Sequence, residues 1–491
     1  MRHLPFPLVC TVLAVSILSS GCLEKPPVFQ SEVDQPEQPA FPQLETLPVP
    51  PEEEDFYLFS QRLVDLEVPT SIAERLTHGS LNANMRKFPY PYRGMLAFAS
   101  DIDDTTPEEF AEYHRFLNTK EETPNGTGVG LDIGDSLWMY MCNDRPNITD
   151  RSGKGLEGVM TYFDGADPTK KRYANEIKHY FQKGWIDSMH TFGDFSRKNV
   201  KDVCFKRQLA VKAWEEMIQE GITPSLWINH GNEANVDSFG AYDPNRFSRY
   251  QAGDDPTSPA YHTDLSLKNG VHFVWNSVGE SRYGQDSPLF PIRLRDGQKI
   301  WGVHRYTHEV VNGKNDWTWV PREVHRQLTA ERLDRLAEQG QYAILGQHFG
   351  GYNIGFPFDE KGVAALRLLE RYQDQGTILV ARTSRLLQYA VAYQHVKSAV
   401  VEHIGETWIN ITAIDDPLFG PQPLTLDAVR GLTFYVEKPE RTHLLVDGKP
   451  LPPELYQVNQ ADQSGRSSIG IRWFPRDVHD YSYQNQDENA Q

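Results

Sequence analysis

Between residues 92 and 393, runs rich in β-branched and aromatic residues alternate with stretches whose apolar residues recur every three or four positions. The first pattern is typical of buried strands and the second of amphipathic helices. Their alternation predicts βα units and a parallel sheet. Seven strands over about 300 residues favour a closed or nearly closed barrel, although an open sheet would give the same alternation. The predicted strands are 94–100, 184–190, 224–229, 271–275, 299–304, 342–347 and 377–381.

The pattern changes near residue 399, where short β-like runs separated by turn residues replace the alternation. We therefore expect an α/β fold in which a distorted (β/α)7 barrel at 56–398 precedes a C-terminal antiparallel β-sandwich at 399–476. Apolar runs at 129–141 and 158–163 predict a hairpin inserted after the first βα unit. The polar segment 477–491 is predicted to be a disordered tail.

The first 21 residues read as an export signal. Arg2 and His3 precede an apolar stretch, and small residues then lead directly to Cys22. This order resembles the lipobox of bacterial lipoproteins, in which the cysteine is lipid-modified after cleavage. The alternative is an ordinary secretory signal followed by a cysteine without a role.

The segment 22–55 is predicted to be a disordered tether behind a lipidated Cys22. After that cysteine it holds eight prolines and nine acidic residues against one lysine, a composition that cannot bury enough apolar surface to fold. We expect the protein at the cell envelope, attached to a membrane through its lipid. The formal charge of −18 excludes nucleic acid as a partner. Cys142 and Cys204 would then either pair in an oxidising compartment or remain free thiols.

Polar and ionisable residues follow nearly every predicted strand, where a βα barrel carries its chemistry. Any one of them has a structural explanation, such as capping a helix, but the whole row indicates a site. A divalent cation needs carboxylate and imidazole ligands with one position left for water. These strand-end residues are Asp101, Asp103 and Asp104, then His190 and Asp194, Asn229 to Asn232, Trp275 and Asn276, His304 and Arg305, His348, and Arg382.

Asp103, His190 and Asp194 form the predicted metal site. His190 and Asp194 are four residues apart, so they would share one side if a helical turn follows the strand. Asp101 is placed to accept a proton from the attacking water, and His348 is placed to protonate the leaving group. The residues thus indicate metal-assisted hydrolysis.

Three segments of the chain resemble motifs of the polysaccharide deacetylases, which are also called NodB-homology carbohydrate esterases. Residues 94–104 (GMLAFASDIDD) resemble the first motif of that family, in which a strand ends in paired aspartates. Residues 190–194 (HTFGD) resemble the second motif, and 343–348 (AILGQH) resemble the late strand that carries a catalytic histidine. The resemblance extends over about residues 92 to 393.

The family implies a distorted barrel with a divalent metal, commonly zinc. Its paired aspartates serve as base and ligand, which gives Asp101 and Asp103 these roles, or Asp103 and Asp104 in the other register. Asp194 stands where the family more often has a second histidine. The family's Arg-Pro motif is replaced by the run 229–232, so Asn229, His230 and Asn232, with Trp275, become candidate substrate-binding residues.

The resemblance implies N-deacetylation of an acetylated amino-sugar polymer. Two other functions fit the same residues. A glycoside hydrolase on this barrel would need two carboxylates and no metal. A polysaccharide-binding lipoprotein without catalysis would explain the missing Arg-Pro motif, but not the retained acids and histidines.

Overall fold

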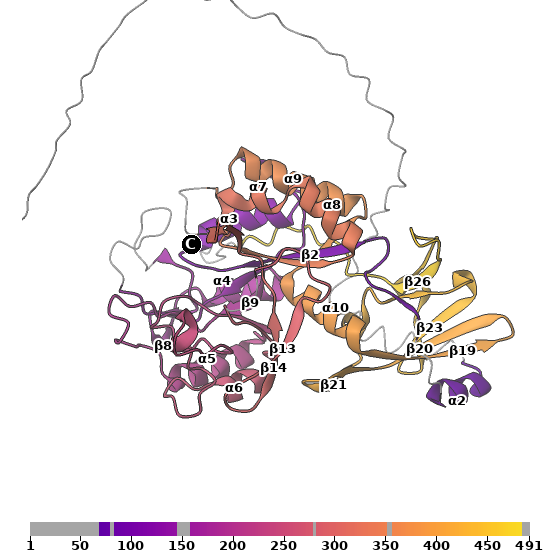
Figure 1. The fold of residues 1–491 in the computed structure, drawn as a ribbon, viewed down its shortest axis with the longest axis horizontal. Helices are drawn as coiled ribbons and strands as arrows, with labels where there is room; N and C mark the ends of the chain where they lie inside the picture. Colours follow the sequence, from indigo (N-terminus) through magenta and orange to yellow (C-terminus); the bar gives the residue numbers. More distant parts are fainter. Residues whose placement is uncertain (1–67, 79–82, 145–157, 278–280, 351–355, 484–491) are drawn as a thin grey trace, which may run out of the picture. The chain divides into compact units, whose positions relative to one another are not determined.

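The computed structural model describes residues 68–78, 83–144, 158–277, 281–350 and 356–483. These residues form a mixed α/β fold (Figure 1). The predictions for the signal peptide, Cys22 and the tether lie outside the described residues. Within the described ranges, no helix has both the length and the apolar character needed to cross a bilayer.

Eight parallel strands lie in two sheets. The larger sheet has the order β13-β14-β12-β11-β9-β5, with only β13 antiparallel to its neighbour, and the smaller has the order β17-β2-β18. An isolated bridge between Tyr306 and Leu345 joins the two sheets. The strands are β2 Gly94–Ser100, β5 Asp135–Leu137, β9 Ile186–His190, β11 Leu226–Ile228, β12 Phe273–Trp275, β13 Leu289–Arg293, β14 Lys299–Val303, β17 Tyr342–Gln347 and β18 Ile378–Val380.

All seven strands predicted for the barrel are present, but the predicted inserted hairpin is wrong. β5 lies in the larger sheet, parallel to β9, and β6 (Tyr140–Met141) pairs in parallel with β10 (Gly193–Asp194). A short apolar run fits a hairpin arm and a central strand equally well. Its true partner lies about fifty residues further along the chain, where local patterning gives no signal.

The helices follow the strands as the alternation predicts. Thr106 Oγ1 accepts a hydrogen bond from Glu109 N, and the Glu109 carboxylate accepts one from Thr106 N, so α3 begins with a capping box. This cap fixes the end of the loop that leaves β2. The helices are α2 Thr70–His78, α3 Pro107–Asn118, α4 Ala174–Lys183, α5 Arg207–Glu220, α6 Thr263–Lys268, α7 Val324–Gln327, α8 Ala330–Gln339, α9 Glu360–Asp374, α10 Thr383–His395 and α11 Leu426–Val429.

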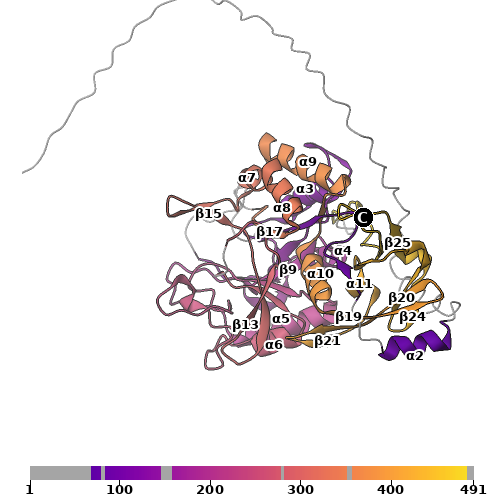
Figure 2. The same cartoon turned by 45° about the vertical axis from the view of Figure 1, so that its right-hand side comes forward.

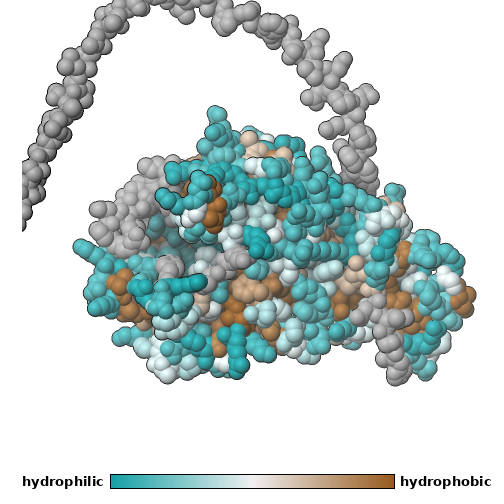
Figure 3. Space-filling model, in the orientation of Figure 1, coloured by the Kyte–Doolittle hydropathy of each residue, from teal (hydrophilic) through white to brown (hydrophobic). Residues whose placement is uncertain are grey.

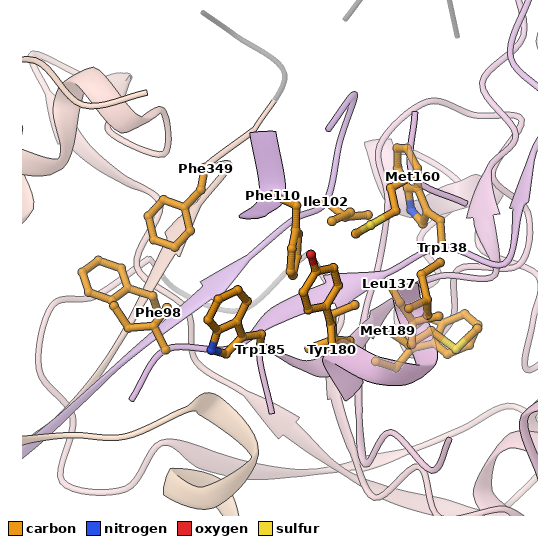
Figure 4. Packing of buried hydrophobic residues seen from close by; sticks show 14 of the residues in the cluster. Phe98, Ile102, Phe110, Leu137, Trp138, Met160, Tyr180, Trp185, Met189 and Phe349 are labelled. Atoms are coloured by element: carbon orange, nitrogen blue, oxygen red, sulfur yellow. The ribbon is translucent and has the colours of Figure 1, made fainter. Parts of the chain in front are cut away.

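Strand β2 is buried on both faces, and its residues alternate between two hydrophobic clusters. Leu96 and Phe98 belong to the cluster that includes α3 and α4, part of which is drawn in Figure 4. Met95, Ala97 and Ala99 belong to a second cluster, to which β11, β12, β14, β17 and β18 also contribute. Asp101 continues the alternation of residues 95, 97 and 99, so its carboxylate lies on the side of β2 that faces the second cluster.

The C-terminal strands, joined by β1 from the beginning of the described chain, form two further sheets. The order β1-β22-β26-β25 is antiparallel throughout, whereas β20 and β23 run parallel in the sheet β19-β20-β23-β24. The prediction of a wholly antiparallel domain is wrong for that pair, because the connection through β22 in the other sheet returns the chain in the same direction. These strands are β1 Met85–Arg86, β19 Val396–His403, β20 Glu406–Asp416, β21 Gly420–Gln422, β22 Thr433–Tyr435, β23 Thr442–Val446, β24 Lys449–Pro450, β25 Tyr456–Asn459 and β26 Ser468–Ile471.

The first part of the predicted disordered tail is bound to the α/β region. The Tyr481 carbonyl lies 2.8 Å from His179 Nε2, and Tyr483 N donates to the Tyr180 hydroxyl. The average polarity of 477–491 conceals these two aromatic residues, which find partners on α4. The predicted domain boundaries at 56, 399 and 477 otherwise stay predictions.

Candidate metal centre

The residues predicted from strand ends come together at one edge of the sheets. The register of β9 with β11 and the register of β2 with β17 bring the carboxyl ends of each pair level. Side chains that follow these ends therefore meet, as the sequence predicts. The group comprises Asp101 and Asp103 after β2, His190 at the end of β9, His230 after β11, and His348 after β17.

Asp103, His190 and His230 form a group that could hold a metal ion. Each offers one ligand atom, and these atoms all lie within 4.8 Å of one another. His190 Nε2 lies 3.0 Å from Asp103 Oδ1, and His230 Nε2 lies 3.6 Å from Asp103 Oδ2. One carboxylate and two imidazoles are a donor set that divalent transition metals accept.

The polar atoms of this group fit a cation. His190 Nδ1 lies 3.1 Å from the Ile228 carbonyl, which can only accept, so Nδ1 carries the proton and Nε2 presents a lone pair in the neutral ring. That lone pair faces Asp103 Oδ1. Both atoms are buried and have no hydrogen-bond partner among the described residues. A cation bound between these two atoms would take one ligand from each.

The charged side chains of the group shift one another's pKa values. Burial would raise the pKa of Asp103, but His230 and His190 hold it well below its ordinary value. Burial would lower the pKa of His230, but Asp103 and Asp194 raise it to about 10. Burial, Asp103 and Asp194 together raise the pKa of Asp104 to about 7. A proton on His230 therefore partly neutralises these acids, and a bound cation would take its place.

Asp194 is not one of the three residues of this group, so its predicted role as a ligand stays a prediction. No helical turn follows β9. Thr191 has a φ of 53°, and the chain enters β10, so Asp194 does not fold back beside His190. Its Oδ1 instead lies 3.5 Å from His230 Nδ1. Ser196 N and the Asn143 amide donate to the same carboxylate and hold it in place.

A disulfide fixes the segment next to Asp194. Cys142 and Cys204 are bonded to each other. Cys142 N also donates to the Asp194 carbonyl over 2.7 Å. The bond therefore secures the backbone that carries the carboxylate facing His230.

Asp101 lies between an arginine and a histidine. Arg305 Nη2 donates to Asp101 Oδ1 over 2.8 Å, and His348 Nε2 lies 3.3 Å from Asp101 Oδ2. Arg305 is buried and lies with its guanidinium carbon 4.6 Å from the centre of the Trp275 ring. A Cβ on Gly346 would lie 2.8 Å from Arg305 Nε, so only glycine leaves room for this arginine. Asp101 is thus oriented toward the histidine.

The loops around the group are conformationally strained. Asp104, Thr191, Asn232 and Ser277 follow β2, β9, β11 and β12, and all have φ between 52° and 72°. Non-glycine residues rarely adopt this region, and a β-branched residue such as Thr191 does so least. Strain of this kind persists where the surrounding structure enforces it and is concentrated at functional sites.

The other predicted substrate-binding residues have structural contacts. Asn229 is buried, and its side chain bonds Trp227 Nε1 and both the N–H and the carbonyl of Phe239. Asn232 Oδ1 accepts from Ala234 N. Both amides therefore hold the loop after β11, and sugar binding by them or by Trp275 stays a prediction.

Three residues near the centre were not given their roles from the sequence. His230 and Arg305 stand in the row of strand-end polar residues, so the signal for them was present. Trp138 gave none. Its ring is stacked on His190, with centroids 5.8 Å apart and planes at 14°, and it also contacts His230. It lies in the segment 129–141, for which the sequence predicts a hairpin.

Comparison with known proteins adds no relative to this description. No protein-family model matches the chain, and a search of curated proteins gives no match either.

Proposed function

We propose that the protein is a metal-dependent hydrolase that removes acetyl groups from an N-acetylated amino-sugar polymer at the cell envelope. The observation that carries the proposal is the convergence of Asp103, His190 and His230 beside Asp101 and His348. The first three offer ligands, and the other two offer an acid–base pair. The resemblance of residues 94–104, 190–194 and 343–348 to motifs of polysaccharide deacetylases suggests the substrate class.

Zinc fits the donor set best. Two imidazoles and a carboxylate with an open position are ligands typical of catalytic zinc. The ion would polarise the acetyl carbonyl and activate a water molecule. Asp103, His190 and His230 would hold it, and Asp194 would orient His230, since carboxylates commonly accept the second N–H of a histidine ligand.

The chain's own residues would handle the protons. Asp101, held by Arg305, accepts a proton from the attacking water. His348, in its protonated form, gives a proton to the sugar nitrogen as the amide bond breaks. The products are acetate and a free amine. Because His348 Nε2 lies 3.3 Å from Asp101 Oδ2, the proton taken up by Asp101 has a short path to the histidine for the next turnover.

We also propose that the α/β region is a distorted barrel and that the protein is exported. The parallel order of β14, β12, β11, β9 and β5, and the bridge from Tyr306 to Leu345 that links this sheet to β17 and β2, support a distorted barrel. The disulfide between Cys142 and Cys204 supports an oxidising, exported compartment. A lipid on Cys22 would then tether the barrel to a membrane.

Chelation tests this function. The chain should release acetate from an N-acetylglucosamine hexamer, lose at least ~100-fold in rate after treatment with a chelator, and regain the rate with zinc. New reducing ends that still form after chelation would identify a glycoside hydrolase instead. Specific binding of the hexamer with neither reaction would identify a binding protein and contradict the proposal.

A further inference from the structure

Among the residues that the structure describes, few large hydrophobic side chains are exposed, and three of them lie on one hairpin. The surface seen in Figure 3 is mostly hydrophilic, with hydrophobic residues in separate patches. The hairpin is formed by β15 (His308–Val311) and β16 (Lys314–Trp317), and Figure 2 shows it projecting from the α/β region. Val310, Val311 and Trp317 are 68%, 45% and 50% exposed. By alternation Val310 and Trp317 share one face of the hairpin, and exposed apolar side chains grouped on one face mark a contact surface.

The hairpin is held in a fixed orientation by its back face. Side chains alternate between the two faces of a strand pair, and Glu309 and Asp316 are directly opposite each other on one face. Glu309 forms an ion pair with Arg332 of α8, and Asp316 forms one with Arg326 of α7. The other face, with His308 and Trp317 side by side, is therefore turned away from these helices.

This front face continues toward the proposed catalytic histidine. Thr318 is buried and its N–H donates to the Thr307 carbonyl, so the pairing extends past Trp317. By alternation, Trp317 and Trp319 then lie on the same side. The Trp319 ring contacts the His348 ring at 4.2 Å, and the His308 ring contacts the Trp317 ring at 4.4 Å. Rings thus continue from His348 outward, with Trp317 about 7 Å beyond Trp319 along the strand.

We propose that Trp317 and His308 form a subsite that stacks on a second sugar unit of the polymer, next to the unit that is deacetylated. The inference rests on the proposed function and names where the substrate chain leaves the centre. A sugar ring presents an apolar face of C–H groups and a rim of hydroxyls. The Trp317 ring can stack on the apolar face. The exposed side-chain amide of Asn315, on the same side of the hairpin, can form hydrogen bonds with the hydroxyls of the rim.

Chain-length kinetics test the subsite. In Trp317→Ala, KM for the N-acetylglucosamine hexamer should rise roughly two- to tenfold, the effect of losing one aromatic contact. The kcat on the hexamer should stay within about twofold, and kcat/KM on a derivative of single N-acetylglucosamine should be unchanged. Trp317→Tyr should restore most of the hexamer affinity. Ile404→Ala, which removes an exposed side chain between β19 and β20, is the matched control.

The outcomes separate this inference from the proposed function. A hexamer KM unchanged in Trp317→Ala, with the wild type active, would overturn the subsite alone. A wild type that releases no acetate from either substrate would instead contradict the proposed function. An equal loss on both substrates in Trp317→Ala would mean a structural role for the tryptophan and would also overturn the subsite.

Discussion

Replacing His348 with alanine is expected to lower kcat for acetate release by roughly two to four decades while the protein keeps its metal ion. His348 Nε2 lies 3.3 Å from Asp101 and 3.5 Å from Asp103, but the ring is outside the group of three candidate ligands. Its removal should therefore take away a proton donor and leave the ligands in place. Acetate release and metal content, measured on the same preparation, check both parts.

The control for this variant is His479→Ala. His479 is an exposed histidine in the C-terminal segment, paired with Asp477 and far in sequence from the strand ends. That variant should match the wild type in rate and metal content. A His348→Ala protein with near wild-type kcat would remove His348 from the mechanism, and one without metal would make it a ligand.

Alanine at His230 is expected to abolish tight binding of the ion, whereas Asp194→Asn should weaken it by roughly 10- to 100-fold. His230 offers a nitrogen to the candidate ion, while Asp194 contacts the other nitrogen of the same ring. The His230 variant leaves two side chains to bind the ion. The Asp194 variant removes only the charge that orients His230, so all three ligands remain. Competition titration with a chromogenic zinc chelator measures both affinities, and circular dichroism shows whether the variants remain folded.

The opposite pattern would restore the ligand set predicted from sequence. If Asp194→Asn lost the ion and His230→Ala retained it, Asp194 would be the ligand and His230 a neighbour. Equal, small losses in both variants would place the ion elsewhere and contradict the geometry described above.

Local patterning predicted the fold wherever a strand is long and wholly buried. β2 and β17 match their predicted ranges of 94–100 and 342–347, because every residue in them is buried. β5 was misassigned, since three residues carry no periodicity and its neighbour β9 is distant in sequence. The parallel pairing of β20 with β23 was missed for the same reason, as it depends on a crossover through another sheet.

The sequence predicts the candidate-site residues that directly follow a strand, but it does not predict the paths of the loops. Residue order along the chain shows which side chains leave a strand end, so Asp103 and His190 could be placed together. The path of a loop depends on backbone conformations that residue type does not disclose. After the left-handed Thr191 the chain enters β10, and Asp194 lies outside the group of three candidate ligands, which includes His230 from the loop after the neighbouring strand β11.

Metal analysis of the purified chain and of His190→Ala, together with anomalous diffraction at the zinc edge, tests the central claim most directly. The account predicts one divalent ion per wild-type chain, with its anomalous peak between Asp103, His190 and His230. The variant should lack the ion and the peak. A metal content that is the same in both proteins, or a peak away from these three side chains, would contradict it.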